Sequence, residues 1–322
     1  MTAATIGSAP ITRVWLRRML GGFWLLDALL QLQPFMFTRA FATTVLLPSA
    51  DGQPTWIAAP IREAALLTAQ HPVPYNCAFA GVQLALGGGL LFGRIPRVTL
   101  AASIAWGIGI WYIGEGLGGL ASGHATLITG APGAAAFYVL LAAAAWPTRR
   151  AAMSTAGLPT WLPSAWTAGW LAAGILQLLP AQATAAAVQD ALSHEPTALS
   201  NTVHVRVEVP NGLGTAGPAL IALAFAAIGG AAARAGLLRK LALGVGAGVT
   251  VIFWIFGQDA GQLFTGHATD PNTAPLILVL AGAVASVPRR RLPQHAYSMS
   301  NAGGKAPTAA ARNRLVAPNY VS

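Results

Sequence analysis

Apolar residues fall into eight long stretches along the chain, and short polar or charged segments separate these stretches. A helix that crosses a bilayer needs about 17 to 25 predominantly apolar residues, and most of the stretches are close to that length. The fourth and the eighth are shorter and rich in Ala, Gly and Pro. The pattern predicts eight transmembrane helices, with approximate cores at residues 19–37, 75–92, 98–117, 131–146, 163–180, 212–233, 241–258 and 273–287.

The composition favours a membrane protein and excludes a water-soluble enzyme. Hydrophobic residues make up 55% of the 322 residues and charged residues only 9%, against roughly 25% charged in an ordinary soluble domain. So few charges cannot cover a water-exposed globular surface. The single cysteine, Cys77, cannot form an internal disulfide, and we expect it to act as a small apolar residue of a membrane helix.

The placement of charge predicts the orientation of the chain in the plasma membrane. Basic clusters lie on alternate connections between the stretches, so the positive-inside rule places these connections and both termini in the cytoplasm. On this topology 16 of the 19 basic residues are cytoplasmic, and none of the nine acidic residues is. We interpret the basic clusters as topological signals that contact anionic lipid, and we expect no nucleic-acid partner. The clusters are Arg13/Arg17/Arg18, Arg94/Arg97, Arg149/Arg150, Arg234/Arg239/Lys240 and Arg289/Arg290/Arg291.

The two halves of the chain share a pattern at a spacing of 143 to 146 residues. Residues 24–34 resemble residues 170–180, and residues 111–126 match residues 254–269 with eight identities in sixteen aligned positions. The second match ends in the tetrapeptide Gly-His-Ala-Thr in both halves. Because each half holds four spans, an even number, both halves enter the membrane from the same side. The sequence therefore predicts an all-α integral membrane protein with eight transmembrane helices, built as two parallel four-helix repeats.

This interpretation divides the chain into four parts. A cytoplasmic N-terminus (1–18) precedes the first repeat (19–150), which carries an outside loop at 38–74. The second repeat (160–291) carries an outside loop at 181–211. A polar cytoplasmic tail (292–322) without apolar periodicity is expected to be disordered.

Three shorter segments carry their own expectations. In the first outside loop, residues 61–69 have a weak apolar stripe at helical spacing, which predicts a short interfacial helix. In the second, residues 203–209 alternate strictly and predict an extended arm. The first apolar stretch, followed by residues 40–42 (Ala-Phe-Ala), has features of a cleavable signal peptide. It is long for that role and contains Asp27, and the second repeat keeps the equivalent span, so we expect it to be retained.

The layout of each half resembles a known kind of membrane unit. A first span, a long outside segment and a Gly-rich second span that ends in Gly93-Arg94 look like the four-helix DoxX-type unit. The stretch from Trp111 to Pro132 is similar to uncharacterised polytopic membrane proteins of actinobacteria. The resemblance implies a tandem duplication of a DoxX-like unit, and it brings with it neither an activity nor a functional residue.

A polar seam is expected between the first spans of the two halves. Asp27 lies near the middle of the first span, where an ionised carboxylate costs about 2.5 to 3.5 kcal/mol, so it must be neutral, paired or facing water. Gln31 lies one turn further on, and Gln177 is its counterpart in the second repeat. The carboxyl group either carries protons on a solute or ion path or makes a hydrogen bond that holds the halves together.

A second candidate site lies at the outer ends of the third and seventh spans. Trp111 and Glu115 are four residues apart and share one helix face, as do Trp254 and Gln258, with Asp259 beside the latter. Glycines at small-xxx-small spacing around these positions allow helix backbones to approach closely.

The repeated histidines suggest a further role for these ends. If the two segments meet about the pseudo-two-fold axis, His124 and His267 converge with Glu115 and Asp259 at one outward-facing site. Two imidazoles and two carboxylates suit a transition metal, and two imidazoles can bind haem axially. Alternatively, Gly-His-Ala-Thr forms a turn at a helix end in which the histidine bonds to the backbone.

Three functions remain open from the sequence. No P-loop, no Gly-x-Ser-x-Gly and no His-Glu-x-x-His motif occurs in the sequence, which favours a non-enzymatic role. The first hypothesis is binding or passage of a small solute or cation at the repeat interface, with Asp27, Glu115 and Asp259 as polar groups. The second is a redox membrane protein that holds haem, copper or quinone through His124 and His267. The third is a structural subunit that binds another membrane protein.

Overall fold

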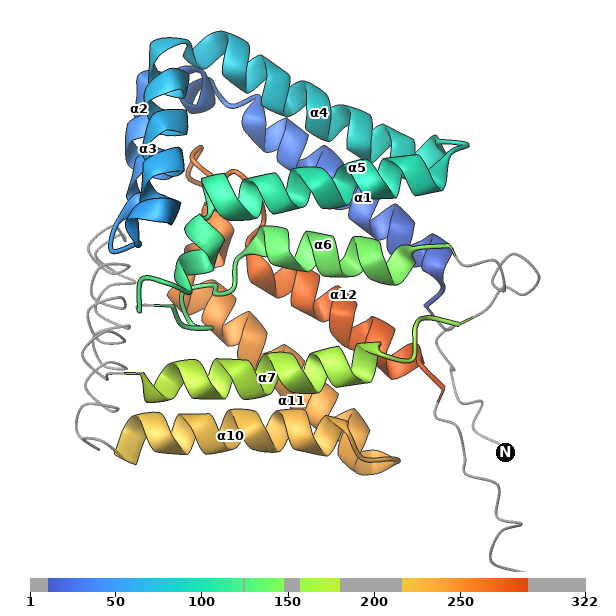
Figure 1. Ribbon diagram of the computed structural model, residues 1–322. Coiled ribbons are helices and arrows are strands. Elements are labelled where there is room, and N and C mark those ends of the chain that lie inside the picture. Colours follow the sequence, from blue (N-terminus) through green and yellow to red (C-terminus); the bar gives the residue numbers. More distant parts are fainter. Residues whose placement is uncertain (1–10, 124, 148–156, 180–215, 289–322) are drawn as a thin grey trace, which may run out of the picture. The chain divides into compact units, whose positions relative to one another are not determined.

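All regular structure in the described part of the chain is helical (Figure 1). The computed structural model describes residues 11–123, 125–147, 157–179 and 216–288. Each of the eight predicted stretches contains a helix, and no strand occurs in these ranges. The eight helices are α1 (Arg13–Gln31), α4 (Pro72–Phe92), α5 (Pro96–Gly109), α6 (Ala134–Ala145), α7 (Leu162–Leu178), α10 (Ala216–Ala232), α11 (Leu237–Gly257) and α12 (Thr273–Ser286).

Two of the described helices are long and apolar enough to cross a membrane, by length and composition alone. These are α4 and α11, with 21 residues each. Helix α1 has 19 residues but carries three arginines and Asp27, and the other five have 17 residues or fewer. The structure therefore supports a helical chain with two candidate spans, and the eight-span topology stays a prediction.

The first helices of each half pair closely with the helix that follows. Helix α1 lies along α4, and α7 lies along α10. A Cβ atom on Gly21 would lie 3.0 Å from Leu90 Cβ, and one on Gly87 would lie 2.9 Å from the carbonyl oxygen of Gly21. In the second pair the Thr167 hydroxyl donates a hydrogen bond to the carbonyl oxygen of Gly229 (2.9 Å). Small residues thus let both pairs of backbones approach.

Helices α6 and α12 form the centre of the described structure. Helix α6 packs against α1 and α5, α12 packs against α11 and α7, and the two contact each other (Figure 1). Their side chains supply a large share of the main apolar core, including the fully buried Leu141 and Leu276. The first four helices and the last four are therefore joined through this α6–α12 contact.

The segment predicted as the first outside loop folds into helical pieces. These are α2 (Arg39–Phe41), the π-helical turn η2 (Ala42–Leu46), the 3-10 turn η3 (Leu47–Ala50) and α3 (Thr55–Gln70), after the 3-10 turn η1 (Pro34–Phe37). Helix α3 buries Ile57, Ile61, Ala65 and Thr68, which recur every three or four residues. The helix predicted at 61–69 is thus confirmed as the second half of α3. The predicted arm at 203–209 and the tail at 292–322 lie outside the described residues.

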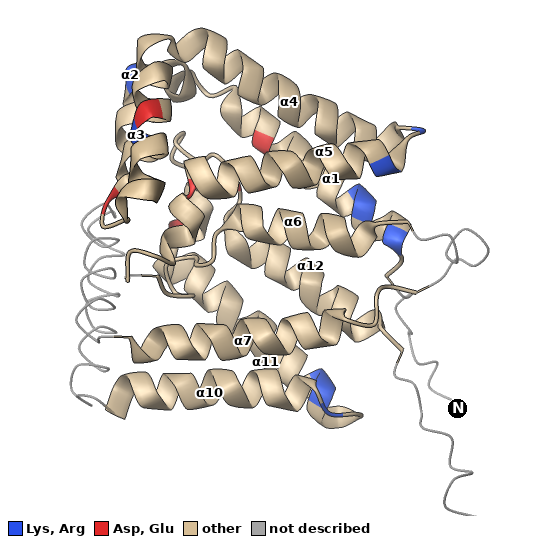
Figure 2. Ribbon diagram, in the orientation of Figure 1, with Lys and Arg blue, Asp and Glu red and all other residues tan. Residues whose placement is uncertain are grey.

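Charged residues concentrate at the ends of the helices. Figure 2 shows Lys and Arg where α4 joins α5 and where α10 joins α11. The Arg13 guanidinium donates to the carbonyl oxygens of Ala144 (3.1 Å) and Trp146 (2.6 Å), at the C-terminus of α6. Arg239 donates likewise to the carbonyl of Val287 (3.3 Å), after α12. Because the last carbonyls of a helix have no partner within it, these arginines complete both central helices.

Candidate functional site

A pocket of about 390 Å³ lies among the helices of the first half. Its walls come from α1, α2, α3, α4, α5 and α6, together with the turn η2 and the π-helical turn η4 (Ile110–Gly114). Residues Thr269 and Asp270, which precede α12 in the second half of the sequence, complete it. We call this space the carboxyl pocket.

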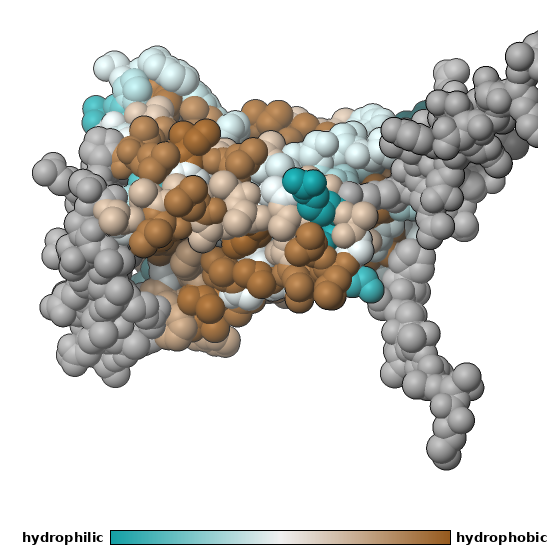
Figure 3. All heavy atoms as spheres, turned by 90° about the horizontal axis from the view of Figure 1, so that it is seen from below, coloured by the Kyte–Doolittle hydropathy of each residue, from teal (hydrophilic) through white to brown (hydrophobic). Residues whose placement is uncertain are grey.

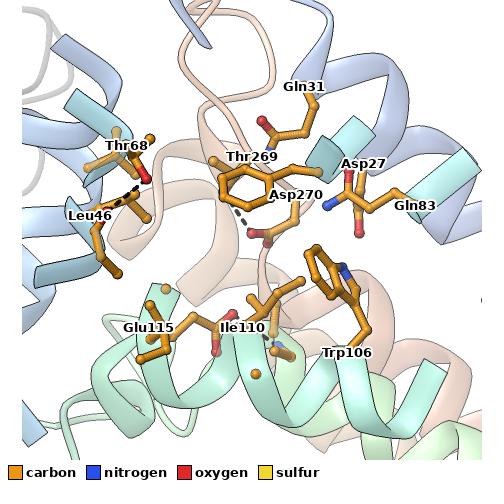
Figure 4. A pocket seen from close by; sticks show the side chains of 18 of the residues that line it. Asp27, Gln31, Leu46, Thr68, Gln83, Trp106, Ile110, Glu115, Thr269 and Asp270 are labelled. Carbon is orange, nitrogen blue, oxygen red and sulfur yellow. Dashed lines mark hydrogen bonds between the residues drawn. The ribbon is translucent and has the colours of Figure 1, made fainter. Parts of the chain in front are cut away.

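Three carboxyl groups line the pocket from three different elements. Asp27 comes from α1, Glu115 follows η4, and Asp270 lies in the segment before α12. Figure 4 shows the three side chains around the same space, with the ring of Trp106 at its edge. The described residues that line it include no Lys, Arg or His. The pocket therefore presents negative charge, or protons held on carboxyl groups, to anything that enters it.

Several polar atoms of the lining are buried without a hydrogen-bond partner. Asp27, Gln83 and Tyr138 are at most 3% exposed. The Tyr138 hydroxyl lies close to the Asp27 carboxyl group but lacks the geometry of a hydrogen bond to it. Buried polar groups in proteins nearly always have partners, so this set indicates a ligand or water in the pocket. The unpartnered atoms are Asp27 Oδ1, Gln31 Oε1, Gln83 Oε1, Trp106 Nε1, Glu115 Oε2 and the Tyr138 hydroxyl.

The backbone around α6 holds Glu115 in place. Its Oε1 atom accepts a hydrogen bond from the backbone N–H of Ala135 (2.9 Å), in the first turn of α6. A Cβ atom on Gly133 would overlap Oε2, so only glycine fits beside the carboxylate. The Trp111 indole donates to the carbonyl oxygen of Pro132 (2.7 Å) and fixes the chain just before that glycine. The predicted pair of Trp111 and Glu115 therefore positions one carboxyl group.

Both π-helical turns of the described chain border the pocket. Turn η2 contributes Val45 and Leu46, and turn η4 contributes Ile110, Ile113 and Gly114. A π-helical turn widens the helix by one residue, and such turns are frequent at functional sites. Here the wider turn at the end of α5 carries the chain directly into Glu115.

Asp270 is held by its own loop. Its Oδ1 atom accepts from the backbone N–H of Asn272 (2.7 Å), and its Oδ2 atom accepts from the Thr269 hydroxyl (2.9 Å). Burial raises the pKa of Asp270 above its ordinary value, and these two hydrogen bonds oppose the rise. The same segment contacts the first half at a second place, where the centroid of the His267 ring lies 4.1 Å from the centroid of the Phe35 ring.

The segments after the third and seventh predicted spans have matching local geometry. The Trp254 indole donates to the carbonyl oxygen of Pro271 (2.8 Å), as Trp111 does to Pro132. Residues 116–119 and residues 259–262 all have positive φ, between 46° and 73°. These two left-handed turns lie at the 143-residue spacing read from the sequence.

The aligned positions differ in their chemistry. Asp27 aligns with Ala173, and Glu115 with Gln258, whose side chain is taken up by hydrogen bonds to Thr273 Oγ1 (3.1 Å) and the carbonyl oxygen of Leu127 (3.3 Å). Continuing the Gly-His-Ala-Thr match by one residue aligns Asp270 with Leu127, which is buried in the apolar core. The three acidic positions of the carboxyl pocket thus have uncharged counterparts.

The structure brings together only part of the predicted polar seam. Gln31 lines the carboxyl pocket beside Asp27, whereas Gln177 is buried on α7 and does not line it. Helix α1 packs against α4 and α6, and α7 packs against α10 and α12. The two glutamines therefore lie in different groups of helices, and Asp27 faces a pocket of the first half.

Of the described outer-end candidates, only Glu115 lines the carboxyl pocket. Glu115 enters the carboxyl pocket, while Asp259 and His267 are not among its lining residues. His124 lies outside the described residues, so the pairing of the two histidines stays a prediction. Within the described ranges no group of three or more His, Cys, Asp or Glu side chains is arranged to hold a metal ion. The described residues thus do not supply a metal centre.

Most of the residues that line the pocket were not predicted from the sequence, among them Gln83, Trp106, Tyr138 and Asp270. Asp270 directly follows the second Gly-His-Ala-Thr motif, so its position beside a repeated motif was an available signal. Gln83 is a polar residue inside a predicted span, and this was a second available signal. Tyr138 and Trp106 are aromatic residues of a kind that is ordinary in membrane helices, so the sequence gave no indication that they line a site.

Comparison with known proteins found no family model, no curated protein and no solved structure that matches this chain. The likeness to DoxX-type units and to actinobacterial membrane proteins therefore stays a prediction from the sequence.

Proposed function

We propose that the chain is a multi-pass plasma-membrane protein with eight spans, in two four-helix halves, and with both termini cytoplasmic. The support is a helix in every predicted stretch and basic residues on alternate connections. Large apolar side chains are exposed along α10 and α11, among them Leu220, Leu223, Val245 and Ile252. Figure 3 shows that apolar side chains cover much of the face viewed there. A bilayer accounts for such a surface, whereas water does not.

The short helices α6 and α12 are compatible with this topology. Each follows a segment of irregular backbone, and the irregular residues Thr126, Leu127, Ala131 and Ala268 are buried. Non-helical backbone is tolerated at membrane depth where protein surrounds it. Helix α5 is prolonged by η4 to Gly114, which brings this span to the length of a bilayer crossing.

Within that frame, we infer that the protein binds a small cation in the carboxyl pocket. One observation carries the inference: Asp27, Glu115 and Asp270 line one pocket whose described lining has no basic residue. A buried carboxylate is costly unless a positive charge or a proton accompanies it. An entering cation supplies that charge and satisfies oxygen atoms that have no partner in the protein.

The comparison of the halves supports a single site. We propose that the chain arose by duplication, and that one copy keeps acidic residues which the other lacks. Ala173, Gln258 and Leu127 occupy the positions that align with the three acids. The aligned tryptophan bonds and left-handed turns are alike in both copies. The backbone features are thus shared by both halves, whereas the acidic residues occur in only one. This difference is expected if binding takes place at that one pocket.

Thermal unfolding of the detergent-purified protein in a panel of cations tests the proposal. The panel holds Na⁺, K⁺ and tetraalkyl- and arylammonium chlorides at constant ionic strength. At least one cation is expected to raise the unfolding temperature of the wild type, since a ligand at 100 times its Kd adds about 2.7 kcal/mol of stability. The variant Asp27→Asn removes the charge at nearly constant volume and is expected to lose that response.

The matched control is Asp259→Asn. It makes the same chemical change at a predicted site residue that does not line the pocket, and its response is expected to equal that of the wild type. The proposal is wrong if no cation stabilises the wild type, or if Asp27→Asn responds to the cations as fully as the wild type does.

A further inference from the structure

Aromatic rings form much of the wall of the carboxyl pocket. Six aromatic side chains line it, in addition to the aliphatic residues of η2, η4 and α3. The face of an aromatic ring attracts a cation, and it does so more strongly where water is excluded. The rings belong to Trp24, Phe41, Tyr75, Phe79, Trp106 and Tyr138. Such a wall suits a cation that carries hydrocarbon, because an inorganic ion gains little from apolar surface.

The arrangement of the three carboxyl groups also favours a ligand of molecular size over an inorganic ion. The three carboxyl groups border a volume of about 390 Å³, and no three acidic side chains among the described residues converge closely enough to hold a metal ion. A small inorganic ion could contact one wall only and would leave the rest of the volume to water. An occupant of molecular size can reach the acids and the rings together.

Asp27 is the carboxyl group best suited to pair with the cation. Both oxygens of Asp270 accept hydrogen bonds from its own loop, and Glu115 accepts one from Ala135 at Oε1, although its Oε2 atom has no partner. Asp27 Oδ1 has no partner, and the residue is only 2% exposed. Of the three acids, Asp27 therefore gains most from a positively charged ligand.

Resting on the proposed function, we propose that the ligand is an apolar organic cation, an ammonium group bearing alkyl or aryl substituents, and that its entry displaces a proton. The ammonium group pairs with Asp27, and its substituents lie against Trp106 and the neighbouring rings. The pocket is mostly apolar, so this pairing takes place in a poorly solvated space where charge attraction is strong.

The displacement of a proton is inferred from the titratable groups that line the pocket. The titratable side chains of its lining are Asp27, Glu115, Asp270, Tyr75 and Tyr138, and no described lining residue is basic. Three carboxylates cannot all be ionised together in such a space, so the empty pocket retains protons. When the cation binds, a carboxyl group gives its proton to solvent and its carboxylate pairs with the ammonium group. One positive charge enters, one leaves, and no other reactant is needed.

Isothermal titration calorimetry with phenyltrimethylammonium tests this proposal on the full-length protein in detergent. Its neutral isostere, tert-butylbenzene, has the same shape without the charge. Phenyltrimethylammonium is expected to bind and tert-butylbenzene to bind at least tenfold more weakly. Titrations in two buffers of different ionisation enthalpy are expected to show release of about one proton for each ligand bound near neutral pH, and less release at high pH.

Variants separate the two interactions. Asp27→Asn is expected to weaken binding at least tenfold and to abolish proton release, and Asp27→Glu to restore part of both. Trp106→Leu is expected to weaken binding of phenyltrimethylammonium about fivefold, the size of a partly desolvated cation–π contact. Trp161→Leu, at an exposed tryptophan outside the pocket, serves as the matched control and is expected to bind as the wild type does. Gel filtration of each variant checks that it is folded.

The outcomes distinguish this proposal from the function on which it rests. If Na⁺ or K⁺ binds in a manner that depends on Asp27 while phenyltrimethylammonium does not bind, the cation site stands and the organic ligand is wrong. If tert-butylbenzene binds as tightly as the ammonium compound, charge does not govern the pocket and this proposal is overturned. If binding releases no proton, the exchange is overturned. If no cation of any kind binds, the proposed function itself fails.

Discussion

Asp270 is an acid that the second half of the chain contributes to a pocket of the first. Burial raises its pKa in the folded protein, so the folded state favours the protonated carboxyl group. The stability that the carboxyl group contributes is fully present below the pKa of an unfolded Asp, about 3.9. It is lost as the pH rises through the higher folded pKa.

Asp270→Asn tests this linkage in buffers without an added ligand. The asparagine keeps an oxygen that can accept from the Asn272 N–H but does not ionise. The unfolding temperature of the variant relative to the wild type is therefore expected to be higher at pH 8 than at pH 4, because only the wild type loses stability as this carboxyl group ionises. Asp259→Asn is the control. A difference between variant and wild type that does not change with pH would contradict the linkage.

Single residues show where prediction from this sequence succeeded and where it stopped. Asp27, Gln31 and Glu115 were predicted as candidate site residues because they are polar groups in or at the end of apolar stretches, and the structure places all three in one pocket. Asp270 was assigned to an outside loop, since sequence spacing does not reveal that this loop crosses to the other half. For the same reason Asp259 was grouped with Glu115, whereas only Glu115 lines the pocket.

At the scale of elements, the two left-handed turns are the most unusual feature of the backbone. In the first turn, residues 116–119, three of four positions are glycine. In the second, residues 259–262, only Gly261 is, so Asp259, Ala260 and Gln262 adopt a conformation that costs about 1–2 kcal/mol for a residue with a side chain. The second turn therefore holds three residues with side chains at positive φ, whereas the first holds only Leu117.

Gln262→Gly is expected to relieve part of that strain. The Gln262 side chain is exposed and its φ is 56°, so glycine removes the steric cost without opening a cavity. Part of the gain is offset by the greater freedom of glycine in the unfolded chain, which leaves a net stabilisation of about 1 kcal/mol, measured by denaturant or thermal unfolding. Gln262→Ala keeps the strain and is the control. Equal effects of the two variants would show that φ at this position is not the cause.

Gly118→Ala is expected to act in the opposite direction. Its φ is 63°, and a Cβ atom there would overlap the carbonyl oxygen of Pro132, which also accepts the Trp111 indole bond. We expect a loss of more than about 2 kcal/mol of stability, since backbone must move to admit the methyl group. Gly22→Ala, where an added Cβ meets no atom within 4 Å, is the comparison and is expected to be neutral or slightly stabilising. The thermal unfolding of the two variants distinguishes a local clash from a general intolerance of alanine.

The elements were easier to predict than their ends. Hydropathy located eight helices because each of them lies in a long stretch of predominantly apolar residues. It placed the third span at 98–117, whereas α5 ends at Gly109 and continues as a π-helical turn to Gly114. It began the fourth at residue 131, whereas α6 begins at Ala134, after Pro132 and a glycine with φ of 100°. Prolines and left-handed glycines decide these ends, and average hydropathy does not register either.

At the scale of the whole molecule, the proposed topology and the proposed site depend on each other. Helix α3, which lines part of the carboxyl pocket, belongs to the first outside loop of the proposed topology, and Arg94 and Arg234 lie on its cytoplasmic connections. In that orientation the pocket is nearer the outer surface, and the ligand reaches it from outside. The orientation can be measured because Cys77 is the single cysteine.

Cysteine labelling on intact cells tests the orientation directly. In a Cys77→Ser background, Glu63→Cys places a thiol on an exposed position of α3, and Arg94→Cys and Arg234→Cys place thiols at exposed positions of the basic connections. A membrane-impermeant maleimide is expected to label the first variant on intact cells, and the other two only after permeabilisation, because the bilayer separates them. Labelling of all three on intact cells would contradict the eight-span topology. Labelling of the two arginine positions alone would reverse it and place the carboxyl pocket toward the cytoplasm.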